Sequence, residues 1–264
     1  MTDPLPPNDA QKASQSYVLP ALDQDFLLGD STRGVRFLLE YEKAHQALKR
    51  LKIKSTIVVF GSARTLEDGP GKQAHWYQQA RLFGRVASER GGALSNHDGI
   101  HRNVIATGGG PGTMGAANRG ALDAGAMTIG FNISLPHEQE PNPYTTPELT
   151  FQFHYFAMRK MHFAMGANAL VVFPGGFGTF DELFEILTLR QTGKAAQMPI
   201  VLFDEGYWRE VVHWDKLVEY GMIEANDLAL FRFADTADGA WEALVEQGIH
   251  IEQPDGTPAH GKDI

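Results

Sequence analysis

The stretch Pro174-Gly175-Gly176-Phe177-Gly178-Thr179-Phe180-Asp181-Glu182 is the most informative part of this chain. It follows the apolar run 169–173 and precedes the helical pattern 183–187, so it predicts a strand, a glycine turn and a helix. Glycines let a backbone approach a ligand closely, and the start of a helix offers unpaired N–H groups to an anion. Two carboxylates lie within the same few residues. A phosphate site beside a carboxylate indicates chemistry on a phosphorylated metabolite.

Outward from this stretch, short apolar segments alternate with amphipathic ones along most of the chain. The pattern predicts further strands at 56–60, 103–107, 127–133, 150–153, 199–203 and 228–233. It predicts helices at 34–52, 77–90, 116–124, 155–165, 207–219 and 237–247, and a proline-rich loop at 134–147. Continuous apolar strands between helices are typical of a parallel sheet covered on both faces. We therefore predict an α/β fold with a single doubly wound, Rossmann-like parallel sheet and helices on both faces.

Two further loops follow predicted strands. Gly61-Ser62-Ala63-Arg64 follows the strand at 56–60, and Gly108-Gly109-Gly110-Pro111-Gly112-Thr113-Met114-Gly115 follows the strand at 103–107. A doubly wound sheet binds its ligand outside the carboxyl ends of its strands, where these loops and Pro174–Glu182 would meet. The two glycine turns are therefore candidates for phosphate or ribose contacts through Gly109, Gly110, Gly175, Gly176, Gly178 and Thr179. The alternative is that the glycines of the first turn serve only tight packing.

Two common nucleotide sites do not fit the sequence. Gly110, Gly112 and Gly115 have the spacing of a dinucleotide fingerprint, which also needs an acidic residue at the end of the next strand. Here that strand ends in Phe131-Asn132-Ile133-Ser134. The chain has no Gly-Lys-Ser/Thr, which excludes a Walker-type loop.

Two interpretations of Glu182 stay open from spacing alone. Thr179 and Glu182 fit a capping box at the start of a helix, with Thr179 as the N-cap and Glu182 reaching back to its N–H. The same carboxylate, beside a phosphate site, is a candidate catalytic group. Asp181 is explained as a complement to the helix dipole.

A cationic pair lies in the helix expected at 155–165. Arg159 and Lys160 form either a solvated helix face or a clamp for phosphate or ribose, with Arg159 giving bidentate donors. Met158, Met161 and Met165 fall at helical spacing and are expected in the core.

Two other polar groups are candidate sites. Ser62 and Arg64 follow the first strand, where a nucleotide could lie, although Ser62 also suits a role that only caps a turn. Asn96-His97-Asp98 with His101 superficially resembles a metal cluster. The segment is polar and loop-like and no further ligand is near in sequence, so we expect no metal site.

The three motifs at Pro174–Glu182, Gly108–Gly115 and Met158–Lys160 together resemble the LOG family, in the family's order, from about Ser55 to about Leu244. LOG proteins are nucleoside 5′-monophosphate phosphoribohydrolases, known for activating plant cytokinins and often mislabelled lysine decarboxylases. The resemblance implies cleavage of the N-glycosidic bond of AMP or an N6-substituted AMP to free base and ribose 5-phosphate. It also implies that no cofactor or metal is needed and that the protein is a homodimer or a larger homo-oligomer.

The resemblance also implies roles for single residues. Glu182 and Arg159 match the family's catalytic pair. Substrate and phosphate binding would involve the two glycine turns together with Ser62, Arg64, Met158 and Lys160.

Two other functions remain alternatives. Some relatives of this fold carry a phosphorylated pterin, the molybdenum cofactor, without hydrolysing it, and their glycine loops would look alike. A nucleotide-sensing regulator that contacts a partner through its N-terminal helix is a third possibility. The presence of both Arg159 and Glu182 favours the enzyme.

Composition sets the remaining expectations. The chain has 264 residues, a formal net charge of −9 and no cysteine. The acidic balance argues against a nucleic-acid or anionic-membrane partner, and the lack of cysteine excludes disulfides and thiolate catalysis. The sequence shows no signal pattern and no long apolar run, so we expect a cytoplasmic protein. We expect a disordered tail at 1–16, a helical extension at 17–52, the Rossmann-like LOG domain at 53–247 and a C-terminal tail at 248–264.

Overall fold

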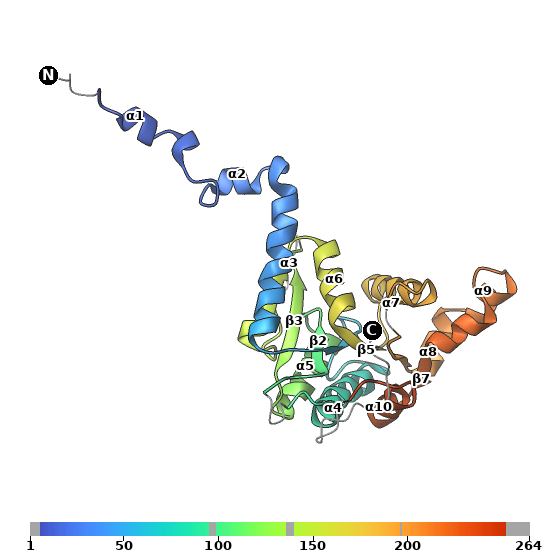
Figure 1. Ribbon diagram of the computed structural model, residues 1–264. Helices are drawn as coiled ribbons and strands as arrows, with labels where there is room; N and C mark the ends of the chain where they lie inside the picture. Colours follow the sequence, from blue (N-terminus) through green and yellow to red (C-terminus); the bar gives the residue numbers. More distant parts are fainter. Residues whose placement is uncertain (1–5, 95–98, 136–139, 196, 252–264) are drawn as a thin grey trace. The chain divides into compact units, whose positions relative to one another are not determined.

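The computed structural model describes residues 6–94, 99–135, 140–195 and 197–251 (Figure 1). The chain divides into two compact units, one up to Lys43 and one from Ala44 onward. Each unit is described by itself.

The first unit is small, and its described residues form no apolar core. It holds α1 Asp9–Lys12, α2 Gln24–Leu28, the first part of α3 Arg33–Arg50 and short 3-10 turns at Gln15–Tyr17 and Asp30–Thr32. None of its described apolar side chains is buried. Polar contacts organise it instead. Thr32 Oγ1 donates to the carbonyl of Phe26 at 2.8 Å, and Arg36 donates to the carbonyl of Leu27 at 2.8 Å. These bonds satisfy the carbonyls that the end of α2 leaves free.

The second unit is built on a seven-stranded sheet in the order β4-β3-β2-β1-β5-β6-β7, and every neighbouring pair is parallel. This arrangement confirms the predicted fold class. The strands are β1 Thr56–Phe60, β2 Val104–Thr107, β3 Thr128–Ile133, β4 Thr150–Phe153, β5 Ala167–Val172, β6 Ile200–Phe203 and β7 Arg232–Ala234. The helices are α4 Gln73–Gly91, α5 Thr113–Asp123, α6 Phe156–Gly166, α7 Phe177–Gln191, α8 Glu205–Val211, α9 Trp214–Glu219 and α10 Ala237–Glu246, with 3-10 turns at Pro147–Leu149 and Ala225–Leu230.

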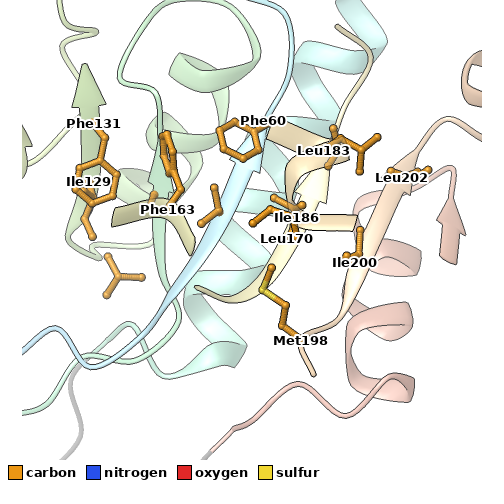
Figure 2. Packing of buried hydrophobic residues seen from close by; sticks show 14 of the residues in the cluster. Phe60, Ile129, Phe131, Phe163, Leu170, Leu183, Ile186, Met198, Ile200 and Leu202 are labelled. Atoms are coloured by element: carbon orange, nitrogen blue, oxygen red, sulfur yellow. The ribbon is translucent and has the colours of Figure 1, made fainter. Parts of the chain in front are cut away.

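The sheet separates two apolar cores, because successive side chains of a strand point to opposite faces. In β1, Val58 and Phe60 pack with α6 and α7, whereas Ile57 and Val59 pack with α4, α5 and α10. Figure 2 shows the first of these cores, in which Leu170, Leu183 and Ile200 lie together. Burial on both faces explains why the central strands are continuous apolar runs rather than alternating ones.

Two secondary-structure predictions near the carboxyl end were wrong. The helix expected at 207–219 is two helices, α8 and α9, separated by extended backbone at Val212. Trp208 and Trp214 are both buried, and in one continuous helix residues six apart would point about 120° apart. The break lets both indoles enter the core.

The strand expected at 228–233 was also wrong in its first half. A capping box between Glu224 and Asp227 begins a 3-10 turn over Ala225–Leu230, and the strand β7 follows only at Arg232. Local capping therefore outweighed the apolar pattern there.

Candidate active site

The candidate site lies at the point where the strand order of the sheet reverses. From β1 the chain adds β2, β3 and β4 on one side, and it then returns to place β5 on the other side of β1. In doubly wound sheets the loops after the two strands at such a point diverge and leave a crevice. A pocket of about 780 Å³ occupies this place. Its lining comes from 60–64 at the end of β1, Gly108 and Met114 around the first glycine turn, Arg159 on α6, and 176–180 and Glu182 at the start of α7.

The start of α7 presents unpaired donors to this pocket. Gly176 is the N-cap and has no side chain to cap the helix. Among the described residues, the N–H groups of Phe177 and Gly178 have no acceptor, as expected for the first turn of a helix. Both residues line the pocket. The donors and the helix dipole together make this turn suited to an anion.

The structure excludes one of the two interpretations of Glu182. The capping box is wrong, because the helix begins at Phe177 and Thr179 lies inside its first turn. The N–H of Thr179 donates to the carbonyl of Gly176 at 2.9 Å. The carboxylate of Glu182 therefore does not cap the helix but contacts Arg159.

Arg159 and Glu182 form a buried ion pair on the wall of the pocket. Arg159 Nη2 lies 3.3 Å from Glu182 Oε1, and the side chains are 14% and 4% exposed. The guanidinium also lies over the rings of Phe156 and Phe163, with 5.1 and 5.6 Å to the ring centroids. These rings and the carboxylate hold the cation in one place. Its Nε is buried and has no partner in the described part of the chain.

Burial sets the protonation behaviour of this pair. It raises the pKa of Glu182 above the ordinary value of 4.5, and the charges of Arg159 and Lys160 oppose the rise. Burial also lowers the pKa of Arg159, against the effect of Glu182, although a guanidinium stays charged. Glu182 is therefore a stronger base than an exposed carboxylate, which suits a role in proton transfer.

Lys160 forms ion pairs with two other carboxylates of α7. Its Nζ lies 2.8 Å from Asp181 Oδ2 and 2.8 Å from Glu185 Oε2. Partial burial would lower the pKa of Lys160, but the hydrogen bonds to these two carboxylates outweigh it and the pKa is raised. Lys160 lines a separate depression of about 560 Å³, which shares Phe177 and Phe180 with the main pocket.

The methionines of α6 fulfil the core prediction only in part. Met158 packs against the apolar core and does not line the pocket. Met161 and Met165 are exposed, so their placement in the core was wrong. Helical spacing identified a shared face of the helix but not whether that face is covered.

Ser62 and Arg64 both line the pocket, in different roles. Ser62 connects three loops: its N–H donates to the carbonyl of Pro174 at 3.1 Å, and its own carbonyl accepts from the N–H of Thr113 at 3.0 Å. Its hydroxyl accepts from the N–H of Arg64 at 3.0 Å, which is a turn-capping contact. Arg64 is exposed, and within the described chain its guanidinium has no ion-pair partner. It is a cation available to a ligand.

The first glycine turn contributes Gly108 to the pocket, whereas Gly109 and Gly110 lie behind it. The N–H of Gly109 is engaged by Thr107 Oγ1 at 3.0 Å. The amide of Asn142 donates to the carbonyls of Gly109 and Gly110, each at 3.0 Å, and Asn142 is buried. A side chain from a distant loop therefore fixes the shape of this turn.

The predicted residues of the second glycine turn differ in whether they line the pocket. Gly175 is behind the lining, and Gly176, Gly178 and Thr179 belong to it. Sequence reasoning missed Gly108, Met114 and Phe177 as lining residues and Asn142 as a support. The position of Phe177 inside the motif was a usable signal, whereas nothing near Asn142 in sequence marks its contact with the glycine turn.

No group of three His, Asp or Glu residues suited to a metal ion is found in the described ranges. His101 contacts the carbonyl of Ala93 through Nδ1 at 2.7 Å, and Asn96–Asp98 lie outside the described residues. No helix in the same ranges is long and apolar enough to cross a membrane.

Three matches to known proteins identify the family that this chain resembles. A family model described as "Possible lysine decarboxylase" matches residues 114–244. A probable cytokinin riboside 5′-monophosphate phosphoribohydrolase, LOG4 of Oryza sativa subsp. japonica, is 31% identical over 54% of this chain and 63% of its own length. The protein of the same activity named LOG4 in Arabidopsis thaliana is 28% identical over 64% of this chain and 85% of its own length. The resemblance to the LOG family is confirmed.

A solved structure supports the fold alone. The X-ray structure of TM1055, a structural genomics target, matches 73% of this chain and 99% of its own with a TM-score of 0.51 and 20% identity.

Proposed function

From the similarity of this chain to LOG proteins and from the site just described, we propose that it hydrolyses nucleoside 5′-monophosphates to free base and ribose 5-phosphate. AMP or an N6-substituted AMP is the expected substrate. The observation that carries the proposal is the Arg159–Glu182 pair, which is buried in the wall of the pocket beside the unpaired N–H groups of α7. An anion site and a basic carboxylate then lie on one wall.

The start of α7 is the proposed site for the 5′-phosphate. The N–H groups of Phe177 and Gly178 and the guanidinium of Arg64 supply donors and positive charge around one compact anion. A triphosphate would bring further negative charge toward Asp181, Glu182 and Glu185 without a Walker lysine to balance it. We therefore expect monophosphates to be preferred to ATP.

The proposed reaction is attack of water on C1′ of the ribose. The bond between C1′ and the base nitrogen breaks, its electron pair leaves with the base, and positive charge develops on the ribose in the transition state, as in glycoside hydrolysis. Glu182 accepts the proton of the attacking water, stabilises the developing charge, or does both. Arg159 holds Glu182 in place and brings its positive charge to the wall of the pocket. The departing base takes up a proton.

Chromatography of the free base tests this proposal. AMP, an N6-substituted AMP, adenosine and ATP are incubated with the protein under identical conditions, and adenine release is expected mainly from the monophosphates. Adenosine should show a lower maximal rate as well as weaker binding, because phosphate binding energy helps to orient the ribose. If no monophosphate yields base while a phosphorylated pterin binds tightly, the protein is a carrier and the proposal is wrong.

The variant Glu182→Gln tests the role of the carboxylate. We expect turnover to fall by about 10²-fold or more, the usual contribution of a general base. The variant keeps the size of the side chain and an oxygen that can accept from Arg159, so AMP affinity should change little, although loss of the buried charge should lower the melting temperature. Glu210→Gln, an exposed change on α8, is the matched control and should leave turnover unchanged. Wild-type turnover in the Glu182 variant would refute the catalytic assignment.

A further inference from the structure

The turn before α7 contains a peptide group whose orientation is not fixed by the side chains of its own two residues. Gly175 and Gly176 flank this peptide, and neither has a Cβ, so the backbone can rotate the peptide plane at little cost. In a trans peptide the C=O of Gly175 and the N–H of Gly176 point in opposite directions. The two orientations would therefore present either a donor or an acceptor to the pocket, and only the donor suits an anion.

A side chain from another element holds this peptide. The hydroxyl of Tyr207, on α8, donates to the carbonyl of Gly175 at 2.6 Å. Gly176 lines the pocket, whereas Tyr207 does not. The carbonyl is thus held away from the pocket and the N–H of Gly176 is directed toward it. Among the described residues this N–H has no acceptor.

Tyr207 is itself held by a buried group at the end of β6. The N–H of Tyr207 donates to Asp204 Oδ1 at 3.0 Å, and Asp204 is 6% exposed. Lys72 and Trp76 donate to the same carboxylate, each at under 3 Å from Oδ2 (2.9 and 2.8 Å). The tyrosine ring lies edge-on to the ring of Trp76, with 5.8 Å between centroids. The ring contact with α4 and the capping contact with Asp204 therefore fix the position of the hydroxyl.

We propose that Tyr207 is a positioning residue for the phosphate site, and that its hydroxyl keeps the Gly175–Gly176 peptide oriented with the N–H toward the anion. This inference rests on the proposed function for the identity of the anion, the 5′-phosphate. Ribose 5-phosphate and inorganic phosphate are probes of the same site that need no turnover.

The test compares Tyr207→Phe with Tyr220→Phe. The first removes only the hydroxyl and keeps the ring against Trp76. The second changes an exposed tyrosine and is the matched control. Calorimetry should show ribose 5-phosphate binding about three- to tenfold more weakly to Tyr207→Phe, the effect of losing one such hydrogen bond. Affinity for adenosine, which lacks the phosphate, should be unchanged, and Tyr220→Phe should bind both ligands as the wild type does.

A spectroscopic readout separates positioning from general loosening. In the wild type, the amide resonance of Gly176 should shift when inorganic phosphate is added, and in Tyr207→Phe the shift should be reduced. Equal affinity of the wild type and Tyr207→Phe for ribose 5-phosphate would overturn the inference. So would an equal loss of affinity for adenosine, or a wild-type protein that binds no phosphate.

Failure of the proposed function gives a different result. If ribose 5-phosphate binding depends on Tyr207 but no monophosphate releases base, the hydrolase proposal falls and the positioning role stands. If base is released but both proteins bind ribose 5-phosphate equally, only the positioning role falls.

Discussion

At the residue scale, the raised pKa of Glu182 sets the pH dependence of the proposed reaction. The role needs the ionised carboxylate, and protonation removes it as the pH falls through this pKa. Since burial raises the pKa above 4.5, we expect the maximal rate to decline on the acid side with a midpoint above pH 4.5. A pH–rate profile from pH 4 to 9 measures this. The residual activity of Glu182→Gln should lack the acid limb, and an unchanged limb in that variant would assign it to another group.

Arg159 is expected to act through Glu182 and through the substrate. Arg159→Ala removes the positive charge that opposes the raised pKa of Glu182, so the acid limb should move to higher pH. Turnover should fall about 10²-fold, as for a misplaced catalytic group. Arg159→Lys should recover little, because a compact ammonium cannot reproduce the planar guanidinium that contacts Glu182 and lies over the rings of Phe156 and Phe163. The measurement is the pH–rate profile of both variants, and wild-type kinetics in Arg159→Ala would contradict the assignment.

Sequence reasoning reached the main residues of the pocket but not their supports. Pro174–Glu182 and Arg159 could be selected because motif and chemistry coincide in a few adjacent positions. The supports Asn142 and Tyr207 contact glycine carbonyls 33 and 32 residues away, and such contacts follow from how loops pack. Whether Glu182 caps the helix or pairs with Arg159 also depends on the residue at which α7 begins. Motif spacing alone leaves this start uncertain by one helical turn.

At the element scale, the start of α7 and the turn before it require glycine at position 175 but not at position 178. A Cβ at Gly175 would overlap Thr179 Oγ1, whereas a Cβ at Gly178 would meet no atom within 4 Å. Gly175→Ala should therefore lower the free energy of unfolding by about 1–3 kcal/mol, as for an overpacked site. Gly178→Ala should change it by less than about 1 kcal/mol, because alanine is well tolerated in a helix. Urea denaturation of both variants measures this, and equal effects would contradict the close packing.

The elements of the sheet were predictable to within a few residues where both faces are covered. β1 has the expected bounds, and β2, β3, β5 and β6 differ from them by one or two residues at an end. The errors lie where packing is less uniform: a pair of buried tryptophans divides α8 from α9, and a local capping box replaces the first half of the last strand.

At the scale of the whole molecule, α6 leaves apolar side chains uncovered. Phe156, Met161 and Met165 are 50%, 41% and 62% exposed. Apolar side chains gathered on one helix are typical of a contact surface between subunits. We expect a homo-oligomer, at least a dimer, by light scattering at micromolar concentration. The double change Met161→Glu and Met165→Glu should shift it toward the monomer. Leu122→Glu, an exposed change on α5, should not, and a monomeric wild type would refute the expectation.

The position of β1 between two halves of the sheet also concerns the order in which the protein folds. Thr56 Oγ1 donates to the carbonyl of Gly166, 110 residues later, where β1 and β5 meet. Contacts between such distant parts of a chain form slowly, because a long loop must close first. The crevice exists only after this closure, so we expect the loops around it to be among the last parts to gain their native arrangement. A nucleotide that binds there stabilises the joined sheet and not either half alone.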